Sequence, residues 1–219
     1  MPSEKHDTTP PSGSAHRLPT DTDNGMLLII SGPSGVGKTT ITRAIERSIP
    51  DAVFSVSYTT RPVTGVDVDG VDYHFVNTAE FDRRAAAGEF IETAVFAGNQ
   101  YGTPLAPIKA QIGRGRLMIL EIDVEGAKQV KAKMPEAYGV FILPPSEEVL
   151  LGRLRDRKRE PEEVIQRRFQ SAQREIAEAR SCGAYSAFIV NDNLERAIGE
   201  ALRLVREHRA GLGRKSSTR

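Results

Sequence analysis

Short apolar runs alternate along this chain with longer stretches in which apolar residues recur at helical spacing. The clearest runs are bounded by glycine, proline or polar residues: Leu27–Ile30, Val53–Val56, Leu117–Ile122, Gly139–Leu143 and Phe188–Val190. Short runs of this kind are typical of strands that are buried on both faces. Because strands that alternate with helices form parallel sheets, the pattern predicts an α/β fold with a parallel core sheet between helical layers.

Between the second and third of these runs the pattern changes. Val71–Val76 and Phe90–Phe96 have the composition of strands. Asn77 and Glu80 form a capping box, which predicts a short helix that ends near Ala87. We therefore expect an inserted subdomain in this part of the chain.

The C-terminal third has helical character. We expect one helix after Pro145 to about Arg155, and another from Pro161, which suits a first turn, to about Arg180. A further helix carries a core-facing stripe made of Leu194, Ala197, Ile198, Ala201, Leu202 and Val205. After Arg209 the sequence is rich in Gly, Ser, Lys and Arg, which predicts a flexible tail.

A glycine-rich segment lies directly after the first apolar run and opens a helical stretch. It reads Gly32-Pro33-Ser34-Gly35-Val36-Gly37-Lys38-Thr39-Thr40, the pattern of a phosphate-binding loop. Main-chain N–H groups and the following helix N-terminus would hold phosphate oxygens, Lys38 would add a positive charge, and the Thr39 hydroxyl would coordinate Mg²⁺. The alternative is an ordinary glycine-rich turn. The complete pattern in a strand–loop–helix context favours a nucleoside triphosphate site.

Composition excludes several classes of function. Of 219 residues, 39% are hydrophobic and the net charge is +1, so no general field favours nucleic acid or a membrane surface. The one cysteine excludes an internal disulfide, and no apolar stretch is long enough to cross a bilayer. The polar segment 1–24 has neither a signal-peptide core nor a transit-peptide pattern, so we expect a disordered tail and a cytoplasmic protein.

Further motifs follow the phosphate loop in a fixed order. They are Ser55–Arg61, Gly70–Phe75, Gly98–Thr103, Glu121–Ala127, Phe141–Ser146, Glu162–Arg168 and Ile189–Asp192. A phosphate loop alone would indicate only a nucleotide-binding protein. This series, over about 26–208, resembles the guanylate kinase family.

The resemblance implies an enzyme that transfers the γ-phosphoryl group of ATP to GMP, and to dGMP, with Mg²⁺. ATP and GMP would be its partners, without nucleic acid or membrane. The implied fold is a P-loop core with a GMP-binding subdomain and a lid. The expected boundaries are a tail at 1–24, the family domain at 25–209 (core 25–56, 105–152 and 181–208; GMP-binding subdomain 57–104; lid about 153–180) and a basic tail at 210–219.

Residues that match the family motifs would bind the acceptor. Guanine presents adjacent N–H donors, which need acceptors, and the matching residues are Glu92 and Asp123. Ser57 and Thr103 match hydroxyl positions that help to recognise the guanine edge. The GMP phosphate would be held by Arg61, Tyr73 and Tyr101, which offer bidentate and neutral donors.

Other matching residues would act on the donor nucleotide. Arg153, Arg157 and Arg168 correspond to lid-side arginines that contact the ATP phosphates or stack near adenine, and with Lys38 and Arg61 they form the expected catalytic set. Asn191 matches a position near adenine. Glu121 would act on Mg²⁺, through water, together with Thr39.

The chain departs from the family pattern at two places. Thr64 stands where a second phosphate-binding arginine is usual, with Asp67 in place of a glutamate, and Lys158 replaces a lid glycine. The first change leaves open a weaker GMP site, a substitute basic group, or another monophosphate acceptor such as IMP. A protein-binding module of the same fold is a further alternative, although such modules usually have a degraded phosphate loop, whereas Lys38 and Thr39 are intact here.

Overall fold

The structure, a computed structural model, describes residues 25–156 and 161–216. Its larger sheet has the strand order β2-β7-β1-β8-β9 and all its pairs are parallel. The strands are β1 (Met26–Ser31), β2 (Ala52–Phe54), β7 (Leu117–Glu121), β8 (Tyr138–Leu143) and β9 (Ala187–Val190). The expected parallel sheet is therefore confirmed, and every predicted core strand overlaps an observed one.

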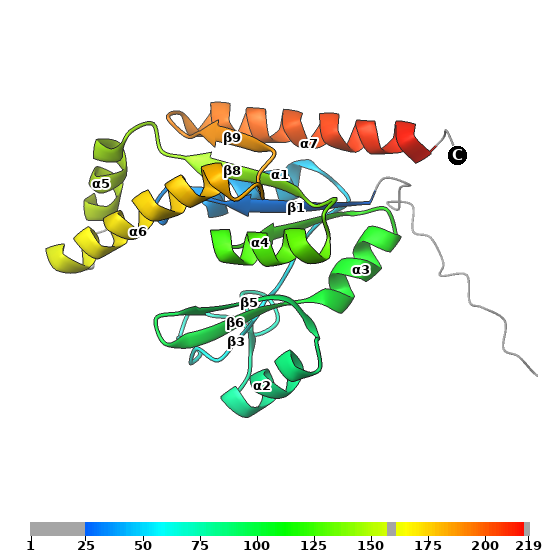
Figure 1. Cartoon of the computed structure of the whole chain (residues 1–219), viewed down its shortest axis with the longest axis horizontal. Coiled ribbons are helices and arrows are strands. Elements are labelled where there is room, and N and C mark those ends of the chain that lie inside the picture. The colour runs from blue at the N-terminus through cyan, green and yellow to red at the C-terminus, as the bar shows by residue number, and fades with distance from the viewer. Residues whose placement is uncertain (1–24, 157–160, 217–219) are drawn as a thin grey trace, which may run out of the picture.

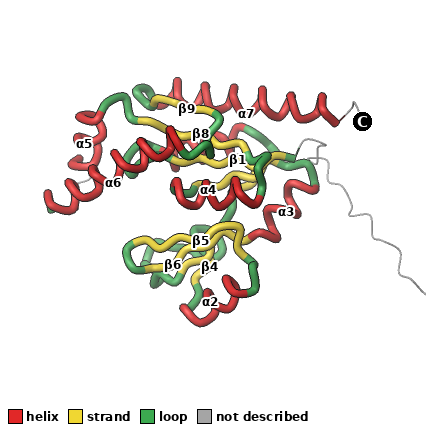
Figure 2. Tube along the Cα trace, viewed as in Figure 1, coloured by secondary structure: helices red, strands yellow, loops and turns green. Residues whose placement is uncertain are grey.

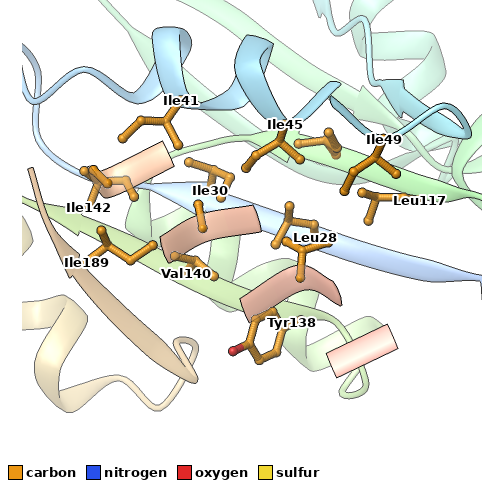
Figure 3. Close-up of a cluster of buried hydrophobic side chains, with 14 of the residues drawn as sticks. Leu28, Ile30, Ile41, Ile45, Ile49, Leu117, Tyr138, Val140, Ile142 and Ile189 are labelled. Atoms are coloured by element: carbon orange, nitrogen blue, oxygen red, sulfur yellow. The ribbon is translucent and has the colours of Figure 1, made fainter. Parts of the chain in front are cut away.

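Alternate side chains of β1 face two different helical layers. Leu28 and Ile30 pack with Ile41 and Ile45 of α1 (Lys38–Ser48), as Figure 3 shows. The apolar stripe of α7 (Leu194–Ser216) belongs to the same cluster. Leu27 and Ile29 point to the opposite face, against α3 (Leu105–Gly113) and α4 (Val124–Lys133). Figure 1 shows the resulting three layers, which match the predicted fold class.

A second, four-stranded sheet has the order β4-β3-β6-β5. Its elements are β3 (Tyr58–Thr59), β4 (His74–Phe75), β5 (Phe90–Phe96), β6 (Asn99–Pro104) and α2 (Thr78–Ala86). The side chain of Asn77 accepts a hydrogen bond from Glu80 N at 2.9 Å, so the predicted capping box is confirmed. Figure 2 shows this sheet apart from the core sheet, with α2 on its far side.

The strand expected at Val71–Val76 is wrong in its first half. Only His74–Phe75 is a strand, because Gly70 has φ 76° and the Asp72 carboxylate accepts a hydrogen bond from Val68 N at 2.8 Å, which forms a turn there. Local side-chain to main-chain bonds of this kind compete with a sheet ladder.

Two helices that follow β8 in the chain pack against each other. Leu150 and Leu154 of α5 (Glu147–Asp156) pack on Ile165 and Ala172 of α6 (Glu162–Ser181). Farther along α6, Ala179 packs with Phe141 of β8 in the core. The segment 153–180 expected as a lid is therefore largely one helix whose C-terminal end belongs to the packed core.

The predicted tail at 210–219 begins too early. α7 continues to Ser216, because Leu212 extends its apolar stripe and Arg209 pairs with Asp51 at 2.6 Å. Adding residues to an existing helix costs little, so these two contacts suffice to continue it. No helix in the described part of the chain is long and apolar enough to cross a membrane.

Candidate nucleotide-binding site

A cleft of about 590 Å³ lies between the phosphate loop, the smaller sheet and α6. It brings together most residues predicted from the sequence to bind nucleotide. Those that line it are Gly32, Ser34, Gly35, Gly37, Lys38, Thr39, Thr40, Ser57, Tyr73, Glu92, Tyr101, Glu121 and Asp123. Thr103 and Asp67 line an adjoining pocket of about 230 Å³, which shares Thr39, Ser57 and Tyr73 with the cleft.

The phosphate loop is held in a folded conformation by contacts to its own main chain. Gly37 has φ 97° at the N-cap of α1, a conformation that favours glycine. Lys38 Nζ donates to the carbonyl oxygens of Gly32 at 2.6 Å and Pro33 at 3.1 Å. From β1 the chain thus turns sharply into α1, with Lys38 over the loop where an anion at the helix N-terminus would lie.

Asn191 supports this loop from behind. Its side-chain nitrogen Nδ2 donates to the Val36 carbonyl at 2.8 Å, and the residue is only 5% exposed. A Cβ atom on Gly37 would come within 2.7 Å of the same nitrogen, so both the glycine and the asparagine shape the loop. The structure therefore places Asn191, predicted near adenine, in contact with the phosphate loop itself.

Thr39 and Glu121 form the candidate metal site. Thr39 Oγ1 donates to Glu121 Oε1 at 2.8 Å, which brings the start of α1 to the end of β7. A hydroxyl and a carboxylate oxygen are hard ligands of the kind that Mg²⁺ takes, and Mg²⁺ usually keeps several waters and substrate phosphates besides. In the described residues no group of three or more His, Cys, Asp or Glu side chains could hold a metal. The donor set thus fits a magnesium ion that arrives with a nucleotide.

Glu92 is the buried acid of the cleft. It is 4% exposed, and Thr103 Oγ1 donates to its Oε1, while Ser57 Oγ lies 3.1 Å from Thr103 Oγ1. Burial raises the pKa of Glu92 above the usual range, and the nearby Asp123 carboxylate adds to this rise. The Thr103 bond opposes it. Glu92 is therefore a fixed acceptor, and its ionised form is unfavourable until a hydrogen-bond donor binds beside it.

Two contacts from α4 position the acidic pair. Asp123 is the N-cap of α4, and its Oδ1 accepts from Gly126 N at 2.8 Å. A Cβ atom on Gly126 would lie 2.9 Å from Glu92 Oε2 and 3.3 Å from Asp123 Oδ1, so only glycine leaves this space open. Gln129 pairs with both main-chain groups of Thr93, at 3.0 Å and 2.9 Å, and so holds β5 beside α4.

Arg61, Tyr73 and Tyr101 form a second cluster, and its two tyrosines line the cleft. The Arg61 guanidinium lies 5.4 Å from the centre of the Tyr73 ring, and the two tyrosine rings are 5.7 Å apart. Asp67 holds Arg61 through two hydrogen bonds, and these bonds, together with those from Thr64, hold the pKa of Asp67 well below its usual range. The sequence predicted the cluster but gave Asp67 no role.

The arginines of α5 and α6 have different positions. Arg168 Nη2 donates to Ser34 Oγ in the phosphate loop. Arg153 Nη2 instead donates to the main-chain carbonyl of Asn191 at 2.9 Å. Arg157 and Lys158 lie outside the described residues. Of the two lid-side arginines that the structure describes, Arg168 is the one whose side chain contacts the phosphate loop.

Glu175 was missed by the sequence analysis. It lines the cleft from α6, and its carboxylate accepts from Ser171 Oγ at 3.4 Å. Burial raises the pKa of Glu175, and the Lys38 ammonium partly opposes this rise. Glu175 follows Arg168 by about two helical turns, so helical spacing from that arginine was the available signal.

Comparison with known proteins gives a consistent result. The guanylate kinase family model matches residues 24–208. The guanylate kinase of Thermobifida fusca is 45% identical over 179 residues, which cover 82% of this chain and 90% of that protein. That of Thermosynechococcus vestitus is 47% identical over 174 residues, 80% and 90% of the two chains.

A solved structure agrees with these sequences. The crystal structure of guanylate kinase from Anaplasma phagocytophilum has a TM-score of 0.68 and 32% identity, and the match covers 84% of this chain and 86% of that one. The match to guanylate kinases thus covers the phosphate loop, Glu92 and the cluster of Arg61, Tyr73 and Tyr101. This chain belongs to the guanylate kinase family.

Proposed function

We propose that this protein transfers the γ-phosphoryl group of ATP to GMP, producing ADP and GDP. Members of the guanylate kinase family are nucleoside monophosphate kinases. The observation that carries the proposal is a single cleft with a phosphate loop on one side and a buried carboxylate, Glu92, on the other. A triphosphate donor and a purine acceptor can therefore bind with their phosphates facing each other.

The acceptor side suits guanine. Guanine presents N1–H and an exocyclic amino group side by side, and both need acceptors. Glu92 and Asp123 are acceptor-only groups when ionised, and they approach the same glycine, Gly126, from two sides. IMP lacks the amino group, and adenine has an acceptor at N1, so either base would leave a buried acid without its partner.

On the donor side, the residues of the chain act by position and charge. Lys38 would exchange the carbonyls of Gly32 and Pro33 for phosphate oxygens, since its Nζ already lies over the loop. Arg168 would add a second cation from α6. Thr39 and Glu121 would hold Mg²⁺, which neutralises charge on the phosphates when it is bound. Phosphoryl transfer depends mainly on such positioning and neutralisation.

Tyr73, Tyr101 and Arg61 would hold the acceptor phosphate. Neutral hydroxyl donors and one arginine fix the phosphate without further charge. Closure of the smaller sheet over the core would exclude water that otherwise hydrolyses ATP. With free nucleotides as its substrates, we infer a cytoplasmic location.

A substrate panel tests the proposal. ADP formation would be measured with ATP, Mg²⁺ and, in turn, GMP, dGMP, IMP and AMP. GMP should have the highest kcat/KM of the ribonucleotides, and Lys38→Ala should lower the rate of ADP formation by about 100-fold or more. Turnover of AMP or IMP without turnover of GMP would reject the proposed acceptor. Absence of any acceptor-dependent ADP formation would reject the reaction itself.

A further inference from the structure

Arg61 is held in place by one carboxylate. Its Nη1 donates to Asp67 Oδ2 at 2.9 Å and its Nη2 donates to Asp67 Oδ1 at 3.0 Å, an end-on bidentate pair. The Arg61 side chain is 25% exposed and that of Asp67 is 12% exposed. A pair of this geometry, partly shielded from water, fixes the plane of the guanidinium as well as its place.

Asp67 is in turn fixed by Thr64. Oδ2 of Asp67 accepts from the main-chain nitrogen of Thr64 at 2.7 Å and from its hydroxyl at 2.6 Å. Asp67 N donates back to the Thr64 carbonyl at 3.1 Å, which closes the turn. Thr64 therefore does more than leave a gap where the family usually has an arginine, because its side chain orients the acid that orients Arg61.

Aromatic rings fix the guanidinium from another direction. Its carbon lies 5.4 Å from the centre of the Tyr73 ring and 5.5 Å from that of Phe75. The end-on pair to Asp67 occupies N–H groups at Nη1 and Nη2, and it leaves the side-on pair, Nε–H with the second N–H of Nη2, directed elsewhere. That side-on pair can bind two oxygens of a phosphate.

We propose that Asp67 and Thr64 are positioning residues that preorganise Arg61 as the single arginine for the acceptor phosphate. The inference rests on the proposed function, because it concerns the phosphate of the acceptor nucleotide. A fixed arginine loses less side-chain entropy on binding than two mobile ones, and this offsets the absent second charge.

The negative charge of Asp67 opposes the entropic advantage of a fixed arginine. A carboxylate beside an anion site weakens phosphate binding, so its removal would strengthen binding if charge were decisive. The two effects have opposite signs for Asp67→Asn. Positioning predicts weaker GMP binding in this variant, and simple repulsion predicts tighter binding.

The test is steady-state kinetics with GMP and ATP as varied substrates. Asp67→Asn should raise the KM for GMP about tenfold or more, with kcat and the KM for ATP changed by less than about threefold. Asp67→Glu should recover most of the loss, since it restores the carboxylate. Thr64→Val keeps the main-chain bond to Asp67 and the shape of the side chain, and it should raise the KM for GMP by a few-fold. This variant replaces Asp67→Asn in the test if Asp67→Asn does not fold.

Two controls separate positioning from other effects. Asp69→Asn removes a charge from the same loop, at an exposed residue whose carboxylate accepts from Phe75 N and not from Arg61, and it should leave the KM for GMP unchanged. Competitive inhibition by guanosine, which lacks the phosphate, should be equal in wild type and Asp67→Asn. A general distortion of the cleft would weaken guanosine as well.

The outcomes distinguish this inference from the proposed function. If wild type uses GMP while Asp67→Asn and Thr64→Val have an unchanged or lower KM for GMP, the inference is wrong and the function stands. If guanosine and GMP weaken equally in Asp67→Asn, the role is structural and the inference is also wrong. If wild type does not phosphorylate GMP, both are wrong.

Discussion

Asn191 Nδ2 donates a hydrogen bond to the Val36 carbonyl at 2.8 Å, and this bond joins the end of β9 to the centre of the phosphate loop. The two residues come from distant parts of the chain, and Gly37 leaves just enough room for the amide. The shape of the donor site therefore depends on a residue that lies behind the loop.

Loss of this bond should affect ATP more than GMP. Asn191→Ala leaves the Val36 carbonyl without its partner in a buried place, which costs roughly 1–3 kcal/mol. We expect a lower melting temperature and a raised KM for ATP, with the KM for GMP little changed. Asn193→Ala is the control, because Asn193 Oδ1 accepts from Arg196 N and caps α7 without touching the loop. Equal effects of the two variants on the KM for ATP would contradict this role.

Glu92 should make GMP use depend on pH. Its pKa is raised by burial, so on acidification it becomes protonated, and loses acceptor capacity, earlier than an ordinary glutamate of pKa about 4.3. The KM for GMP should therefore rise as pH falls toward that value. In Glu92→Gln the KM should be high throughout and should lack this component, while titration of the GMP phosphate is common to both proteins. Parallel profiles would show that Glu92 does not titrate in the site.

The raised pKa of Glu92 also determines how the stability of the fold changes with pH. The fold binds the Glu92 proton more tightly than the unfolded chain does, so between the ordinary value and the raised pKa this residue favours folding increasingly as pH falls. Denaturant unfolding should be measured for wild type and Glu92→Gln across that range. The free energy of unfolding of wild type minus that of the variant should become more positive as pH falls. A value that becomes more negative toward acid pH would contradict the assignment.

Gly126 should tolerate no side chain. In Gly126→Ala the new Cβ would lie 2.9 Å from Glu92 Oε2, so the acid must move and the KM for GMP should rise by about tenfold. Gly152→Ala is matched to it, because Gly152 lies within α5 and has nothing within 4 Å of its Cβ position. That control should keep its activity and gain up to about 1 kcal/mol of stability from helix propensity. Unchanged GMP kinetics in Gly126→Ala would mean that the acids do not contact the substrate.

Lys38→Ala should separate chemistry from folding. The Lys38 ammonium donates to the main-chain carbonyls of Gly32 and Pro33, and Asn191 holds the same loop from behind, so loss of the ammonium should leave the circular dichroism spectrum and the melting temperature close to those of wild type. Removal of a charge at the transferred phosphate should lower kcat by about 100-fold or more. A kcat within tenfold of wild type would exclude Lys38 from the catalytic set.

The core sheet was predictable because strands that are buried on both faces are continuous apolar runs in the sequence, as in Leu27–Ile30. β6 was not predicted as a strand, since Asn99, Gln100 and Gly102 have no apolar alternation and the strand is set by pairing with β5. The end of α7 was missed because its glycines indicated a tail, whereas Leu212 continues the apolar stripe.

Within the site, motif positions were the predictable part. Lys38 and Glu92 line the cleft and Arg61 lies beside Tyr73, which lines it, because a motif fixes residue type and order together. Their supports were not predictable in the same way. Asp67 matches an acidic position of the family motif, but its two hydrogen bonds to Arg61, six positions away, form only in the folded turn, and Gln129 reaches β5 from α4.

The ratio of kcat/KM for GMP to that for IMP, measured for wild type and for Glu92→Gln in the same buffer, tests the guanine assignment most directly. The two substrates differ only at the exocyclic amino group, from which the buried Glu92 and the exposed Asp123 would accept hydrogen bonds. We predict that wild type prefers GMP by at least about 100-fold, since an unpaired buried acid penalises IMP, and that Glu92→Gln loses most of this preference. Equal use of GMP and IMP by wild type, or an undiminished ratio in the variant, would contradict it.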